Sequence, residues 1–162
     1  MALKMRFLYS SKKSQMKQLA AAIKTEFGLS ENNNATDIIP PAYPCENERL
    51  VILGISGKGE LDDIVRRFCG ELNKKKAQNV AIFVDGDEKL AKNAAEVLKA
   101  AGTNVLDNVK IVKFGGIPFI GGKLSDAELK EYLAWVQIIV DSIKWFILYN
   151  YRSPLGCDNF VL

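Results

Sequence analysis

The chain has 162 residues, of which 48% are hydrophobic and 25% charged, as is typical of one folded domain with its own core. Its net charge of +3 is too small to indicate a nucleic-acid partner, and no apolar run approaches the roughly 20 residues that cross a membrane. With no histidine and three cysteines outside any Cys-x-x-Cys pair, we expect reduced thiols, no metal site, no catalytic residue and a cytoplasmic location.

The first strand and helix of the chain predict a turn suited to an anion. The apolar run Phe7–Tyr9 ends at a polar turn, residues 10–14, and an amphipathic helix follows at once. Its apolar face is formed by Met16, Leu19, Ala20, Ile23 and Phe27. In a parallel sheet such a turn lies where a strand ends and a helix begins, so free N–H groups and the positive end of the helix dipole meet there.

The next part of the chain predicts two strands and a helix. Thr36–Ile39 is a short strand before two prolines, and residues 49–56 are continuously apolar, as in a strand covered on both faces. The turn Gly57-Lys58-Gly59 then leads into a helix expected from Glu60 to Asn73. The inward face of this helix is predicted to be Leu61, Ile64, Val65, Phe68 and Leu72.

The same alternation continues towards the end of the chain. Residues 79–84 predict another buried strand, and a helix is expected from about Glu88 to Ala101. Residues 108–114 are the expected fifth strand, followed by a glycine-rich loop, residues 115–122. Ser125 and Glu128 form a capping box that opens the last helix.

Residues 145–162 form an aromatic C-terminal tail that follows the expected domain, residues 1–144. The last helix is predicted to turn Leu129, Leu133, Val136, Val140 and Ile143 inward. The tail either packs on the body of the domain or mediates self-association, so a homo-oligomer is one expected state. We expect no nucleic-acid partner and no membrane partner.

Strands that alternate with helices predict the fold class. The pattern is typical of an α/β protein, here a three-layer α/β/α sandwich around a five-stranded parallel sheet. Response-regulator receivers share this architecture, but they need acidic residues where this chain has Ser10, Ser11 and Ser56. Phosphoacceptor chemistry of that kind is therefore not expected.

Three loops of the chain resemble those of the flavodoxin family, and the resemblance covers about residues 4–143. They are Tyr9-Ser-Ser-Lys-Lys-Ser-Gln-Met16, Gly54-Ile-Ser-Gly-Lys-Gly-Glu-Leu61 and Phe83-Val-Asp-Gly-Asp87. The resemblance implies the strand order 2-1-3-4-5 and FMN at the switch point between the first and third strands. It also implies an electron carrier with a redox partner protein, and not a stand-alone enzyme.

The resemblance implies a set of FMN-binding residues. The phosphate would be contacted by Ser10, Ser11, Lys12, Lys13, Ser14 and Gln15. The flavin ring would lie between Gly57, Lys58 and Gly59 on one side and Asp85, Gly86 and Asp87 on the other. The phosphate loop is degenerate, because Ser14 and Met16 stand where the family has glycine and threonine.

Each of these loops also has an interpretation that needs no ligand. Residues 10–15 form a serine-rich turn before a helix, and residues 57–59 form a strand-to-helix turn. Asp87 caps a helix, and Asp85 is a solvated turn residue. Two functions follow: a flavodoxin-like, FMN-binding electron carrier, or a degenerate flavodoxin-like module without FMN that acts as a protein-binding or assembly domain.

Overall fold

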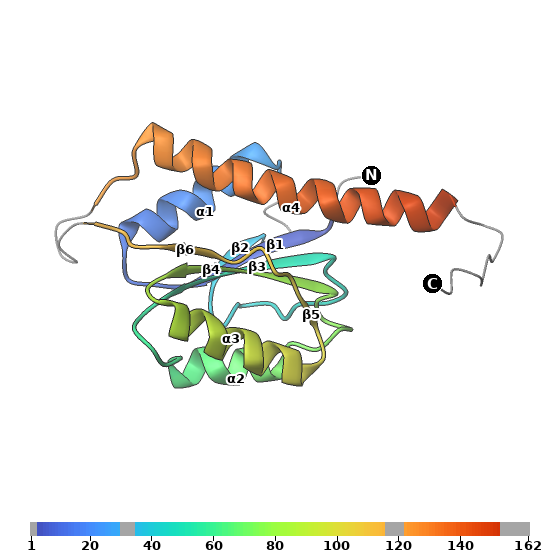
Figure 1. Cartoon of the computed structure of the whole chain (residues 1–162), viewed down its shortest axis with the longest axis horizontal. Helices are drawn as coiled ribbons and strands as arrows, with labels where there is room; N and C mark the ends of the chain where they lie inside the picture. Colours follow the sequence, from blue (N-terminus) through green and yellow to red (C-terminus); the bar gives the residue numbers. More distant parts are fainter. Residues whose placement is uncertain (1–2, 30–34, 116–121, 153–162) are drawn as a thin grey trace.

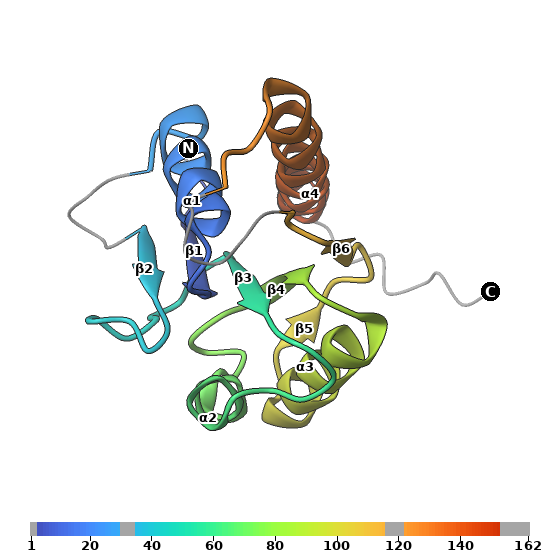
Figure 2. The ribbon, with the colours of Figure 1, turned by 90° about the vertical axis from the view of Figure 1, so that its left-hand side faces the viewer.

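The computed structural model describes residues 3–29, 35–115 and 122–152. The helices are α1 (Ser14–Glu26), α2 (Asp63–Glu71), α3 (Glu88–Ala101) and α4 (Asp126–Arg152). The strands are β1 (Met5–Ser10), β2 (Thr36–Ile38), β3 (Leu50–Ser56), β4 (Asn79–Asp85), β5 (Asn104–Val105) and β6 (Lys110–Val112). Helices α1 and α4 cover one face of the sheet, and α2 and α3 cover the other (Figure 1, Figure 2). The chain is therefore α/β, with a sheet between two helical layers.

The described strands form one parallel sheet. Its order is β2-β1-β3-β4, and both β5 and β6 pair with β4. The predicted parallel α/β architecture is confirmed. Because all strands run the same way, the loops after β1, β3 and β4 leave from the same edge of the sheet.

The edge of the sheet beside β4 differs from the prediction of one strand over residues 108–114. Two short strands share this position: β5 pairs with the start of β4, and β6 pairs with its end. Between them the chain bends at Asp107, whose carbonyl accepts a hydrogen bond from the Val109 N–H. Six strands therefore replace the predicted five, because the polar Asp107 and Asn108 interrupt the pairing.

Alternating residues of the central strands belong to two hydrophobic cores, one on each face of the sheet. Phe7, Ile52 and Phe83 point towards α1 and α4, whereas their neighbours Leu8 and Leu53 point towards α2 and α3. All five are buried, and each contributes on the order of 1.5–3 kcal/mol to folding. The predicted burial of β3 and β4 on both faces is confirmed.

Helix α2 is shorter than predicted and begins three residues later. The Asp62 carboxylate accepts a hydrogen bond from the Ile64 N–H at 2.9 Å, so the helix begins at Asp63. Its inward face consists of Val65 and Cys69, and Ile64 is 55% exposed. The prediction that Ile64 points inward is wrong, because it fits a helix that began at residue 60.

The last helix begins as predicted and ends later. Ser125 and Glu128 form the capping box: the Glu128 N–H donates to Ser125 Oγ, and the Ser125 N–H donates to Glu128 Oε2. Helix α4 then continues without a break to Arg152, so the aromatic segment after residue 144 begins inside a helix. Residues 153–162 of the predicted tail lie outside the described residues.

By length and composition, α4 is long and apolar enough over Asp126–Asn150 to cross a membrane. Tyr132, Val136, Ile139 and Val140 of this helix are buried in the core, but only 28% of the apolar window is buried. Helices α1 and α4 together form one layer of the sandwich, and Figure 1 shows the last turns of α4 running on past the sheet.

Candidate functional site

The carboxyl edge of the sheet brings together the three loops that the sequence singled out. Ser56 Oγ, at the end of β3, lies 2.7 Å from Ser11 Oγ in the loop after β1. The Gly57 N–H donates to the Asp85 carbonyl at 3.1 Å, which ties the β3 loop to the β4 loop. Lys13 Nζ lies 2.8 Å from Asp85 Oδ2. The three loops are therefore joined by direct contacts between their own residues.

Asp85 lies at the centre of these contacts. Its side chain is only 3% exposed, so the prediction that it is a solvated turn residue is wrong. Oδ2 accepts hydrogen bonds from Lys13 Nζ and, at 3.0 Å, from Ser56 Oγ. Oδ1 accepts from the Phe114 N–H at 2.9 Å. A buried carboxylate needs such donors, and here each of its oxygens has at least one.

Ser56 and Ser11 connect the Asp85 carboxylate to the backbone of Lys13 through hydrogen bonds. Ser56 Oγ contacts both Ser11 Oγ and Asp85 Oδ2, but a hydroxyl has one proton to donate. Because a carboxylate only accepts, Ser56 donates to Asp85 and Ser11 donates to Ser56. Ser11 Oγ also accepts from the Lys13 N–H at 3.2 Å. The result is a chain of hydrogen bonds from the Lys13 backbone to the Asp85 carboxylate.

The first turn of α1 contacts the protein's own backbone. Ser14 Oγ donates to the Gly122 carbonyl at 2.7 Å, and Gln15 Nε2 donates to the Gly115 carbonyl at 2.7 Å. Gln15 is buried, and a Cβ added to Gly122 would lie 1.8 Å from its amide nitrogen. Two residues predicted to contact phosphate therefore hold both ends of the segment between β6 and α4.

Of the other predicted site residues, some are exposed at the surface and others lie at the end of a strand or the start of a helix. Lys12 and Lys58 are exposed at the surface, and Ser10 ends β1. Asp87 caps α3 as predicted, because its Oδ1 accepts from the N–H groups of Leu90 and Gly59 at 2.9 and 3.1 Å. These two hydrogen bonds lower the pKa of the Asp87 carboxyl below its ordinary value.

Glycine is required at position 86 by the close approach of two loops. A Cβ added to Gly86 would lie 2.2 Å from the Gly57 carbonyl oxygen, closer than real side chains come to backbone atoms. The Gly86 N–H also donates to the Val112 carbonyl of β6 at 3.0 Å. Gly57 and Gly86, predicted to lie on opposite sides of a flavin ring, pack directly against each other.

Sequence reasoning missed the roles of Ser56 and Phe114 at this edge. Ser56 carried a signal, since it is the polar residue that ends a buried strand. Nothing in the sequence indicates the role of Phe114, because its backbone N–H is what contacts Asp85. Its ring packs on Phe83 at a centroid distance of 6.0 Å.

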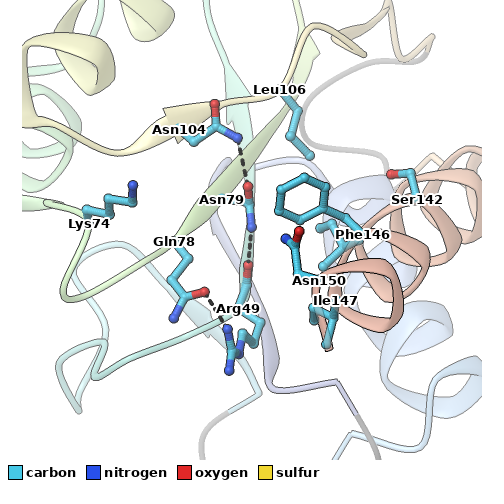
Figure 3. Close-up of a pocket in the computed structure, with 11 residues that line it drawn as sticks. Arg49, Lys74, Gln78, Asn79, Asn104, Leu106, Ser142, Phe146, Ile147 and Asn150 are labelled. Carbon is cyan, nitrogen blue, oxygen red and sulfur yellow. Dashed lines mark hydrogen bonds between the residues drawn. The ribbon is translucent and has the colours of Figure 1, made fainter. Parts of the chain in front are cut away.

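Two hollows in the described part of the molecule lie away from the carboxyl edge. The smaller, of about 200 Å³, lies between the proline-rich segment after β2 and α2. The larger, of about 690 Å³, lies at the amino edge of the sheet under the end of α4. We call the larger one the amino-edge groove. Its lining residues are shown in Figure 3.

Comparison of the sequence with protein-family models and with curated proteins finds no match. The likeness to flavodoxins therefore rests on the three loops and on the arrangement of strands and helices. Similarity of fold does not by itself establish a function, so the carboxyl edge has to be judged on its own chemistry.

Proposed function

We propose that this protein is a flavodoxin-like module that does not hold FMN and acts as a protein-binding or assembly domain. The observation that carries the proposal is the ion pair between Lys13 and Asp85. It lies where a doubly wound fold would place the anionic part of a ligand. In this molecule the cation at that position already has a carboxylate partner.

The internal ion pair and a bound phosphate compete for Lys13. A phosphate that recruits Lys13 leaves the buried Asp85 carboxylate without its cation and close to a second negative charge. Removing one partner of a fully buried pair costs about 3–5 kcal/mol, and the partial exposure of Lys13 makes the cost here smaller. The internal pair therefore opposes phosphate binding at this edge.

The flavin ring would also lack stacking partners at the loops. No aromatic residue occurs at positions 57–59 or 85–90, where the family has an aromatic residue on each side of the ring. Each ring pair contributes on the order of 1 kcal/mol beyond the area that it buries. Gly57 and Gly86 moreover fill the space between these loops by contacting each other.

The alternative function is the FMN-binding electron carrier, with a redox partner protein. One observation favours it: α1 begins at Ser14 without any side-chain cap, so its first N–H groups face the carboxyl edge unpaired by a capping side chain. The hydroxyl of Ser11 and the exposed Lys12 lie next to this helix end.

Titration with FMN distinguishes the two functions. We expect the purified protein to be colourless and to leave the fluorescence of added FMN unchanged up to millimolar protein. The Asp85→Asn variant is the informative companion, because it removes the competing carboxylate and frees Lys13. If the unmodified protein quenches FMN fluorescence with one-to-one stoichiometry, the proposal is wrong and the electron-carrier function replaces it.

A further inference from the structure

Five consecutive residues near the end of α4, residues 145–149, are apolar or aromatic. We call residues 145–150 the α4 tip. Trp145, Phe146, Leu148 and Tyr149 are between 59% and 65% exposed, although each is large and apolar. The rings of Trp145 and Tyr149 stack on each other, with centroids 5.3 Å apart and an interplanar angle of 15°. A helix that is apolar all round is normally buried, so we expect another surface to cover the exposed α4 tip.

The amino-edge groove lies directly beside the α4 tip. Phe146, Ile147 and Asn150 line it from α4, and Leu106 lines it from the segment after β5 (Figure 3). The tip and the groove are thus neighbours on one chain, a projection next to a hollow of about 690 Å³.

Four of the polar side chains in the groove already have partners within it. Asn104 Nδ2 donates to Asn79 Oδ1 at 2.7 Å, and Asn79 Nδ2 donates to the Arg49 carbonyl at 3.0 Å. Arg49 Nη1 donates to Gln78 Oε1 at 2.8 Å (Figure 3). An apolar occupant therefore leaves these donors and acceptors paired, while Lys74 and Arg49 give the groove two cationic side chains.

We propose that two copies of this chain form a symmetric dimer in which each α4 tip fills the amino-edge groove of the other copy. This inference rests on the proposed function, and it names the partner. A projection and a hollow that are adjacent on one chain can pair reciprocally about a two-fold axis, and such an assembly closes at two copies.

The exposed area agrees with a dimer of ordinary size. A large aromatic side chain buries about 150–250 Å² when it is covered, so the exposed part of the α4 tip amounts to roughly 500 Å² per copy. The groove walls outside the tip add to this area, and a stable interface of standard size buries ~800 Å² per partner. Trp, Tyr and Phe are also the residues enriched in interface cores, and the α4 tip contains all three.

Sedimentation velocity of the full chain over a range of concentrations tests the dimer. We expect a reversible monomer–dimer equilibrium in the unmodified protein. Leu148→Glu and Trp145→Glu should each raise the dimer dissociation constant at least about 30-fold, because they place a charge in a buried apolar contact. Ile64→Glu is the matched control: Ile64 is also a large exposed aliphatic residue, on α2 across the sheet, and its substitution should leave the equilibrium unchanged.

Circular dichroism of each variant checks that the fold is retained, since all of these side chains are exposed. A monomer at every concentration overturns the inference, as does a dimer that the two α4 substitutions do not weaken. Binding of the monomer to phospholipid vesicles, lost in Leu148→Glu, would also overturn it and assign the α4 tip to a lipid surface.

The two proposals fail separately. A monomer that ignores FMN overturns the dimer alone, and a dimer that binds FMN overturns the proposed function alone.

Discussion

Asp85 links three parts of the carboxyl edge through its side chain. Its carboxylate joins the loop after β1 through Lys13, the end of β3 through Ser56, and the segment after β6 through the Phe114 N–H. The Asp85 side chain is buried, whereas that of Lys13 is 31% exposed. The pair is therefore partly screened by water, but loss of the lysine still leaves a buried carboxylate without its cation.

Substitution of Lys13 tests this link. We expect Lys13→Met to lower the free energy of unfolding by about 1–3 kcal/mol, because Asp85 then keeps only neutral donors. Lys12→Met is the matched control: Lys12 is the adjacent lysine and is exposed, so its loss should change stability by less than about 0.5 kcal/mol. Urea unfolding measures both. Equal effects of the two substitutions would show that the ion pair contributes nothing.

The pH dependence of stability tests the cap at Asp87. Hydrogen bonds from the N–H groups of Leu90 and Gly59 lower its pKa below the ordinary 3.8, so the folded state favours the ionised carboxyl. The stabilisation from this shift is present above the ordinary pKa and is lost as the pH falls through the lowered folded pKa. Asp87→Asn should therefore remove part of the acid-induced loss of stability.

Urea unfolding at a series of pH values from neutral to acid measures this difference. The curves for the unmodified protein and Asp87→Asn should converge as the pH falls. Parallel curves over the whole range would contradict a cap that depends on the charge of Asp87.

At the scale of elements, the contact between the β3 and β4 loops fixes how the carboxyl edge is closed. The Gly57 carbonyl and the Gly86 Cα come so close that a Cβ at position 86 has no room. Backbone atoms on both sides leave no flexible side chain that could move away. The two loops therefore pack backbone against backbone at the end of β4.

Two glycine substitutions measure the importance of that contact. Gly86→Ala should destabilise the protein by about 2 kcal/mol or more, because the loops must separate to admit the methyl group. Gly70→Ala lies within α2 with no atom near the new Cβ, so it should stabilise the protein by about 0.5–1 kcal/mol. Thermal unfolding of both variants gives the comparison. A neutral Gly86→Ala would contradict the closed arrangement of the loops.

Local patterns in the sequence were enough to predict the elements whose residues carry their own signal. The continuous apolar runs of β1, β3 and β4 identified the sheet, and Asp87, Ser125 and Glu128 identified two helix starts. The start of α2 and the exposed position of Ile64 were missed, because Asp62 and Glu60 are both acidic residues that suit a first turn, whereas Leu61, Val65, Phe68 and Leu72 pack on the core as predicted. Strand β6 lies within the predicted residues 108–114, whereas β5 was missed because its two residues are too few to show a strand pattern.

The contacts within the candidate site depend on residues far apart in the chain. Lys13 and Asp85 are 72 positions apart, and nothing local to either residue indicates the other. The parallel sheet predicted from the sequence places both residues at the carboxyl edge. It could not show that they neutralise each other, because this depends on side-chain directions that only the packed loops determine.

At the scale of the whole molecule, the two edges of the sheet differ in what they leave exposed. The carboxyl edge pairs its buried carboxylate, Asp85, with Lys13 and Ser56. The amino edge leaves the apolar α4 tip and the groove beside it uncovered. We therefore propose that the binding surface of this chain lies at the amino edge and not at the expected cofactor edge.

The most direct test of that claim is sedimentation velocity of the full chain in the presence of FMN, recorded at both the protein absorbance band and the visible flavin band. The account predicts that the protein sediments as a dimer at high concentration while FMN remains in the slow, unbound fraction. Visible absorbance that moves with the protein, in proportion to it, would contradict the account.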